Sequence, residues 1–462
     1  MQSLLLKLRS RFSVSYTLAL YLLASCVLAS TVAFADDQQV ELKIAITGAK
    51  IYTMAEQGVL EIGTVLIRNG EIEKIIAGDE APEGYNTIAA DGKVVTPGLI
   101  AAKSSLGLVE VGMSAGIVDS EVNYQQPGKL GTTIDSQYAI NMQSSLINIT
   151  RIDGVTTAAT GVESSNTLFQ GMGSVISLGD KNSPIINAQA YMSLNLAGSA
   201  AEALSGSRAS LWPELLRAFA EAASLQGRQL TTGQLTNGQL TIEQQWHGEF
   251  AKSDINALIP VLKGDMPLFV TVLRAADIRR VLQLKARYSN IKLVLIHATE
   301  AWMVASDIAA AKVPVVLNPE ANLPYDFDEL GATIENAARL SQAGVKVSIS
   351  NISKYGSDSH NMRLITQLAG NAVANGMPYE AALAAITINS AEILSVAHKV
   401  GSLSEGKQAD VVVWTGDPLE VMHYAEVVII NGELIPMESR QTKLRDRYET
   451  LQSEQPYRYV KP

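Results

Sequence analysis

Short apolar runs alternate with longer amphipathic stretches through the middle of the chain. The apolar runs cover residues 155–159, 185–194, 268–273, 292–296, 313–317 and 345–349. Several are almost continuously apolar, which is typical of parallel strands buried on both faces. Residues 276–288, 301–312, 328–344 and 361–376 have helical spacing between or after them. Repeated strand–helix units favour an α/β fold with a (β/α)8 TIM-type barrel over residues 98–399, and a doubly wound sheet is the alternative.

Both flanks of this middle region have the period of β-strands instead. Residues 63–68 and 71–76 alternate around Asn69-Gly70, and residues 427–430 are followed by Asn431-Gly432. Asn-Gly between alternating runs is a strong signal for a tight hairpin turn. We therefore predict a small β-sandwich domain built from both chain ends, residues 36–97 and 400–435. A charged C-terminal tail, residues 436–462, follows it and has a helical pattern near 438–452.

The N-terminus has the pattern of a secretory signal. Three basic residues precede an apolar run over residues 12–34, and Ala33-Phe34-Ala35 leads directly into Asp36. This order predicts a signal peptide at residues 1–35, a periplasmic location in the cell envelope and no membrane span after cleavage. An uncleaved anchor helix is one alternative. Leu23 to Cys26 resembles a lipobox, so a lipoprotein acylated at Cys26 is another.

Composition excludes several classes of protein. The chain has 462 residues, of which 47% are hydrophobic, so global disorder is excluded. A single cysteine excludes a disulfide scaffold and a cysteine-ligated metal cluster. The formal net charge is −10 and no basic run occurs, which argues against nucleic acid as a partner.

Generic motifs of catalysis and nucleotide binding are missing from the sequence. Gly171-Met172-Gly173 lacks the third glycine of a dinucleotide-binding loop, and we predict a turn there. No phosphate-binding loop, nucleophile elbow or His-Glu-x-x-His segment occurs. Function must therefore be inferred from less general patterns.

Several segments together resemble the amidohydrolase superfamily. Residues 94–100 (VVTPGLI) resemble the entry to its first barrel strand, and residues 401–413 (GSLSEGKQADVVV) resemble its return into a flanking β-domain. Residues 154–157, 169–173 and 297–301 are similar to the imidazolonepropionase-like branch. The resemblance implies a barrel that holds a divalent metal such as zinc and hydrolyses non-peptide C–N bonds.

The ligands of that metal are mostly replaced in this chain. The resemblance places histidines on the first strand, where Lys103 and Ser105 stand, and on the fifth, where Thr271 stands. It places a Lys or Glu on the fourth strand, where Gln189 and Tyr191 are nearest, and an Asp on the eighth, where Asn351 stands. The histidine of the sixth strand is present as His297.

One imidazole is too few to hold zinc, and an ammonium at position 103 repels a cation. We therefore expect neither a metal nor another cofactor, and a catalytically degenerate protein that binds a small molecule or pairs with an active, paralogous amidohydrolase. The alternative is an active hydrolase with a rewired, metal-independent site around His297 and Lys103. A third hypothesis is an interaction scaffold that uses the β-domain and the charged tail. His360 and the acidic loop of Asp326, Asp328 and Glu329 are secondary candidates, for the barrel mouth and for a cation.

Overall fold

The computed structural model describes residues 42–110, 118–124, 129–180, 183–231, 246, 248–353 and 359–449. The predicted signal peptide at residues 1–35, Cys26, His247 and the end of the tail lie outside these described residues. Within them, no helix is both long and apolar enough to cross a membrane.

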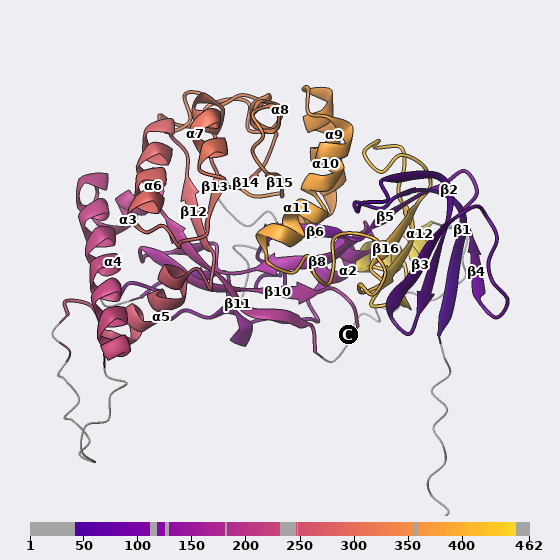
Figure 1. Cartoon of the computed structure of the whole chain (residues 1–462), viewed down its shortest axis with the longest axis horizontal. Helices are drawn as coiled ribbons and strands as arrows, with labels where there is room; N and C mark the ends of the chain where they lie inside the picture. Colours follow the sequence, from indigo (N-terminus) through magenta and orange to yellow (C-terminus); the bar gives the residue numbers. More distant parts are fainter. Residues whose placement is uncertain are drawn as a thin grey trace, which may run out of the picture. The chain divides into compact units, whose positions relative to one another are not determined.

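One sheet joins the two ends of the chain (Figure 1). Its order is β18-β17-β16-β5-β1-β2-β3, with β4 paired to the first half of β1. The connection between the ends is the antiparallel pair of β5 and β16. All eight strands are hydrogen-bonded into a single branched sheet, so the two separate sheets of the predicted sandwich are not confirmed. The strands are β1 (Lys43–Tyr52), β2 (Val59–Arg68), β3 (Glu71–Ala77), β4 (Asn86–Ala89), β5 (Val94–Pro97), β16 (Val411–Trp414), β17 (Ala425–Ile430) and β18 (Glu433–Leu434).

The two Asn-Gly turns are confirmed, and they lie against each other. Asn69 and Gly70 have φ of +50° and +89°, and Asn431 and Gly432 have +54° and +76°, the left-handed values that a type I′ turn needs. A Cβ built on Gly432 would lie 2.5 Å from Cα of Gly70, so the backbones approach closely. The backbone of Ala409 binds both turns, because its N–H donates to the carbonyl of Gly70 and its carbonyl accepts from the N–H of Gly432.

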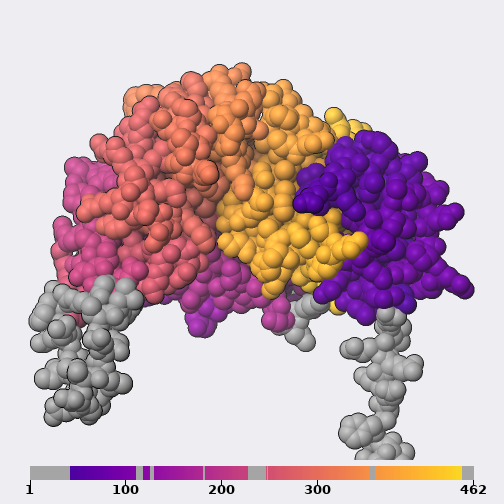
Figure 2. Space-filling model, viewed as in Figure 1, coloured from indigo at the N-terminus to yellow at the C-terminus, as the bar shows by residue number. Residues whose placement is uncertain are grey.

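This sheet has an apolar core of its own, shared by both chain ends. Ile46 and Ile67 from the N-terminal strands pack with Val411, Val413 and Ile429 from the C-terminal strands, and all five are essentially inaccessible to solvent. Figure 2 shows the indigo N-terminal strands directly beside orange and yellow C-terminal segments. Burial of apolar side chains from both ends is what holds them together.

The second sheet also has eight strands, in the order β15-β14-β13-β12-β11-β10-β8-β6. All neighbours are parallel except β10, which is antiparallel to both β8 and β11. A barrel-like α/β sheet is therefore confirmed, but a strict (β/α)8 repeat is wrong at its third strand. The strands are β6 (Leu99–Ser104), β8 (Val155–Thr160), β10 (Phe169–Ser177), β11 (Ile185–Asn195), β12 (Leu268–Val272), β13 (Leu293–His297), β14 (Val315–Leu317) and β15 (Val347–Ile349).

The reversed strand follows from short connections. Residues 161–168 and 178–184 join β10 to its neighbours, which is too short for the crossover that parallel strands require. The first connection includes β9 (Ser164–Ser165), which pairs with β7 (Glu121–Val122). The turn predicted at Gly171-Met172-Gly173 is wrong, because these residues lie inside β10. Their glycines instead allow close packing against Ile134 and Tyr191.

Helices cover the parallel part of this sheet (Figure 1). The helix predicted at residues 328–344 is shorter than expected, since only α8 (Asn336–Gln342) forms. Asp328 instead accepts a hydrogen bond from the N–H of Gly198 and pairs with Arg208, which holds its loop out of a helix. The other helices are η1 (Ser136–Tyr138), α2 (Ser145–Arg151), α3 (Gly198–Leu204), α4 (Arg208–Thr231), α5 (Lys252–Lys263), α6 (Ala275–Arg287), η2 (Ala301–Val304), α7 (Ala305–Ala310), η3 (Ser359–Leu364), α9 (Ile365–Ala374), α10 (Tyr379–Ala385), α11 (Ile388–Ile393) and α12 (Arg440–Tyr448).

A few contacts join the two sheets to each other. Oγ1 of Thr157, on β8 of the second sheet, donates to the carboxylate of Asp410, which directly precedes β16 of the first. Asp410 is buried between the sheets, where its carboxylate accepts from the N–H of Asn431 and its carbonyl accepts from the N–H of Gly98. Gly154, just before β8, has φ of +92° and touches the ring of Trp414. Backbone turns and one indole therefore fix how the sheets meet.

Gly154→Ala should destabilise the protein, because its Cβ would lie 2.7 Å from Cη2 of the buried Trp414 ring. The left-handed backbone alone costs an L-residue about 1 kcal/mol, and the clash adds to that. We expect the free energy of unfolding, measured with urea, to fall by about 2–4 kcal/mol. Gly344→Ala is the matched control, since Gly344 has φ of +80° and nothing within 4 Å of its Cβ. Equal losses in both variants would contradict this packing.

Asp153→Asn should stabilise the protein near neutral pH. Burial raises the pKa of the Asp153 carboxyl to about 6, against the attraction of Arg363. Because this pKa lies above that of the unfolded chain, ionisation of the carboxyl lowers the free energy of unfolding. The loss grows as the pH rises from about 4 to 6 and is fully present above pH 6. We expect a gain of about 1–3 kcal/mol at pH 7.5 that disappears near pH 4. Urea unfolding at both pH values measures this gain. A gain that does not depend on pH would contradict the prediction.

Candidate functional site

The residues at the replaced ligand positions lie on one edge of the barrel sheet. Lys103 is near the end of β6 and Ser105 directly follows it. Thr271 is near the end of β12, His297 ends β13, and Asn351 follows β15. These strands all run in the same direction, so their C-terminal ends meet at the same edge, where barrel proteins place their sites. The residues named from the sequence therefore lie at one edge of the sheet.

Lys103 is buried at the end of β6, with only 7% of its surface exposed. Its ammonium donates a long hydrogen bond of 3.4 Å to the carbonyl of Val162. Burial lowers the pKa of Lys103, and the nearby carboxylate of Glu163 opposes this shift. The amine of a lysine is thus held inside the barrel end, at a position where the resemblance places a metal ligand.

Ser105 and Asn351 are occupied by bonds to the protein itself. Oγ of Ser105 lies 2.7 Å from Oγ of Ser359, which also accepts from the N–H of Ser105. The amide of Asn351 donates to the carbonyl of Asn361 over 2.9 Å and accepts from Asn318 over 3.3 Å. Both side chains therefore cross-link loops at the strand ends.

Ser350 joins the two end strands of the barrel sheet. Its hydroxyl donates to the carbonyl of Lys103 over 2.9 Å, which links the residue after β15 to β6. No ladder of backbone bonds pairs these two strands in the sheet order. A side-chain hydrogen bond therefore crosses the seam of the barrel beside the buried ammonium.

His297 has an unusual backbone conformation. Its φ is +66°, and that of the next residue, Ala298, is +45°. Non-glycine residues in this region are uncommon and cluster at functional sites. The N–H of Ala298 donates to the carbonyls of Val272 and Ile296, which holds the turn in place. His297 is half-buried, as is Thr271 on the neighbouring strand.

Tyr191 fills the barrel interior where the fourth-strand ligand was expected. Its ring is fully buried and stacks on Phe269 of β12, with 4.3 Å between ring centroids. Gly173 makes room for it, since a Cβ there would lie 2.0 Å from Cζ of Tyr191. Its hydroxyl is buried without a hydrogen-bond partner among the described residues, and burial raises its pKa. Sequence analysis named Tyr191 only as a neighbour of a missing ligand.

The other candidates from the sequence lie apart from this edge or have structural partners. Gln189 is exposed and donates to Asp135. His360 is exposed in η3 and contacts Asn361. In the acidic loop, Asp328 pairs with Arg208, which accounts for its charge.

The described residues do not fit the metal that the resemblance implies. Among them, no group of three or more His, Cys, Asp or Glu side chains is placed to hold an ion. The donor set at the strand ends is one imidazole with hydroxyls and amides that are largely bonded to the protein, beside an ammonium. Such a set has few deprotonated ligands and would therefore hold a divalent metal only weakly.

Comparisons with known proteins agree with the fold. Residues 270–435 match the model of the amidohydrolase family. The imidazolonepropionase of Geobacillus kaustophilus is 36% identical over 107 residues, which are 22% of this chain and 25% of that protein. The imidazolonepropionase of Brevibacillus brevis is 33% identical over 125 residues, which are 26% of this chain and 29% of that protein. The chain thus matches little more than a quarter of the length of these relatives.

A solved structure extends the likeness over most of the chain. The crystal structure of an amidohydrolase from Thermotoga maritima superposes with a TM-score of 0.73 at 23% identity, covering 85% of this chain and 99% of that one. At this identity the likeness concerns the fold alone. Together with the family match over residues 270–435 and the related segments, it makes this chain similar to amidohydrolases in fold and, over about a quarter of its length, to imidazolonepropionases in sequence.

Proposed function

We propose that this protein is a catalytically degenerate amidohydrolase that binds a small, carboxylate-bearing molecule at the C-terminal end of its barrel. The observation that carries the proposal is the buried Lys103 ammonium, which stands at a first-strand ligand position. Its one hydrogen bond among the described residues, to the carbonyl of Val162, is 3.4 Å long. An anion that took the place of this carbonyl would form a charge-assisted bond to Lys103 in a poorly solvated place. The hydrolysis of C–N bonds, typical of the superfamily, is not part of this proposal.

The contacts around Lys103 support a binding site more than a hydrolytic one. Hydrolysis by a metal needs an open coordination position and a carboxylate to move protons. Here the side chains of Ser105 and Asn351 form hydrogen bonds with Ser359 and Asn361. These bonds stabilise the barrel end. A rigid end with one buried cation suits recognition of an anionic group.

Binding is tested with hydantoin-5-propionate, a stable cyclic compound with one carboxylate. We expect isothermal titration calorimetry to detect binding to the unmodified chain and at least a tenfold loss in Lys103→Met, because a buried charge pair is broken. Lys346→Met is the control, since it removes the same charge from an exposed lysine at the start of β15, paired with Glu392. Equal losses in both variants, or no binding to the unmodified chain, would overturn the proposal.

The second candidate is an active, metal-independent hydrolase, and the left-handed backbone of His297 favours it. Strain of this kind positions a side chain for chemistry in many active sites. Turnover of 4-imidazolone-5-propionate, the compound for which the relatives are named, distinguishes the two functions. Turnover that persists with a chelator and disappears in both His297→Ala and Lys103→Met would replace the binding function with this one.

We also propose that the protein is exported to the periplasm and acts there alone or beside a paralogous amidohydrolase. The basic, apolar and small-residue order of residues 1–35 supports export. Mass spectrometry of the secreted chain should find a mature protein that begins at Asp36. A chain that begins at an acylated Cys26 would establish the lipoprotein alternative instead, and an intact N-terminus would contradict processing.

A further inference from the structure

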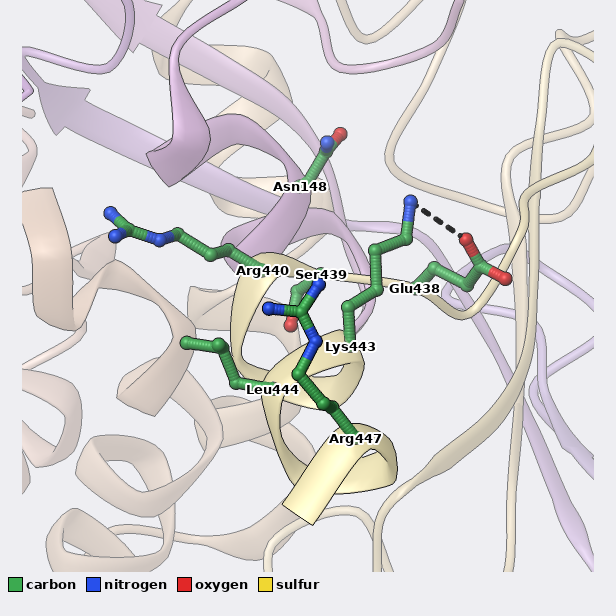
Figure 3. Close-up of a pocket in the computed structure, with 7 residues that line it drawn as sticks. All are labelled: Asn148, Glu438, Ser439, Arg440, Lys443, Leu444 and Arg447. Carbon is green, nitrogen blue, oxygen red and sulfur yellow. Dashed lines mark ion pairs between the residues drawn. The ribbon is translucent and has the colours of Figure 1, made fainter. Parts of the chain in front are cut away.

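Helix α12 presents three cations to a cavity on the surface. Arg440, Lys443 and Arg447 are spaced three and four residues apart, which places them along one side of the helix. They line a cavity of about 360 Å³, and Asn148 of α2 contributes to its wall from the other side (Figure 3). Two helices distant in sequence therefore enclose a cationic pocket.

Only part of this charge is neutralised within the protein. Lys443 pairs with Glu438 over 3.0 Å, and both side chains are largely exposed. Among the described residues, Arg440 and Arg447 make no ion pair or side-chain hydrogen bond. The lining therefore carries three positive charges and one negative charge, on a chain whose formal net charge is −10.

Burial of apolar side chains does not account for the stability of α12, although its three cations repel one another. None of its nine residues is buried. Its N-terminus is held by a capping box between Ser439 and Thr442, and like charges along one side oppose helix formation. A helix without an apolar core face, held in place by its cap, is suited to present charged side chains.

The lining matches one class of ligand. Guanidinium groups form paired hydrogen bonds with phosphate oxygens, and an ammonium adds a point charge. Leu444 and the amide of Asn148 are also part of the lining and offer contacts to an organic group with hydroxyls. A bare phosphate would leave these contacts unused.

We propose that the pocket between α2 and α12 binds a phosphate monoester, either as a free metabolite or as the headgroup of a membrane lipid. Arg440 and Arg447 hold the phosphate, and Leu444 and Asn148 contact the alcohol part. The pocket is a second binding site, and it does not depend on Lys103 or on any activity at the barrel end.

Two matched variants of the full chain test the proposal. Titration with glycerol 3-phosphate at an ionic strength of about 0.15 M, where the Debye length is about 8 Å, should show binding that Arg447→Gln weakens at least tenfold. Arg445→Gln is the control, because Arg445 lies on the same helix, pairs with Asp446 and does not line the pocket. We expect its affinity to stay within about twofold of that of the unmodified chain, since loss of one unit of distant charge is largely screened.

A second arm distinguishes the sources of the phosphate. Co-sedimentation with phosphatidylcholine vesicles that contain phosphatidic acid, against pure phosphatidylcholine, reports binding to a lipid headgroup. Loss of binding in Arg447→Gln but not in Arg445→Gln, in either arm, supports the proposal and names the source. Equal weakening by both substitutions would indicate non-specific electrostatic attraction and would overturn the proposal. The absence of binding in both arms would also overturn it.

Discussion

The barrel end depends on how one buried ammonium is accommodated. Lys103 is at the end of the first barrel strand, and moving its charge out of water is unfavourable. The fold offers it one carbonyl and the nearby carboxylate of Glu163. A divalent cation beside the charged form of this lysine would add electrostatic repulsion to this cost.

The residues at the expected ligand positions take part in hydrogen bonds across the seam of the barrel. A metal bound at strand ends joins strands that are distant in the sequence. In this chain Ser350 bonds to the carbonyl of Lys103, Ser105 to Ser359, and Asn318 to Asn351. Each bond is modest, about 1 kcal/mol in net stability, but together they fix the first and last strands of the barrel. Hydrogen bonds within the protein thus hold the barrel end in order.

The sequence predicted most of the fold because the relevant signals are local. Apolar runs marked the buried parallel strands, and the two Asn-Gly pairs marked turns that need left-handed backbone. It missed the reversed strand β10, since its glycines usually indicate a turn and their close packing against Tyr191 is a tertiary effect. It also extended α8 too far, because the ion pair of Asp328 with Arg208 joins residues far apart in the chain.

The candidate site was predictable in position but not in its contacts. The resemblance placed Lys103, Thr271, His297 and Asn351 at strand ends, and the structure has them there. Loops whose approach no local pattern encodes bring Ser105 to Ser359 and Asn351 to Asn361. The hydroxyl of Tyr191, which has no hydrogen-bond partner among the described residues, likewise depends on tertiary packing.

The most direct test of the central claim, that Lys103 has taken the place of the metal, is the metal content of the full chain purified without a chelator. Elemental mass spectrometry should find almost no transition metal per chain, because too few deprotonated ligands remain to bind it. About one ion per chain, lost on substitution of His297, would show that a metal and the buried ammonium coexist, and would contradict the account.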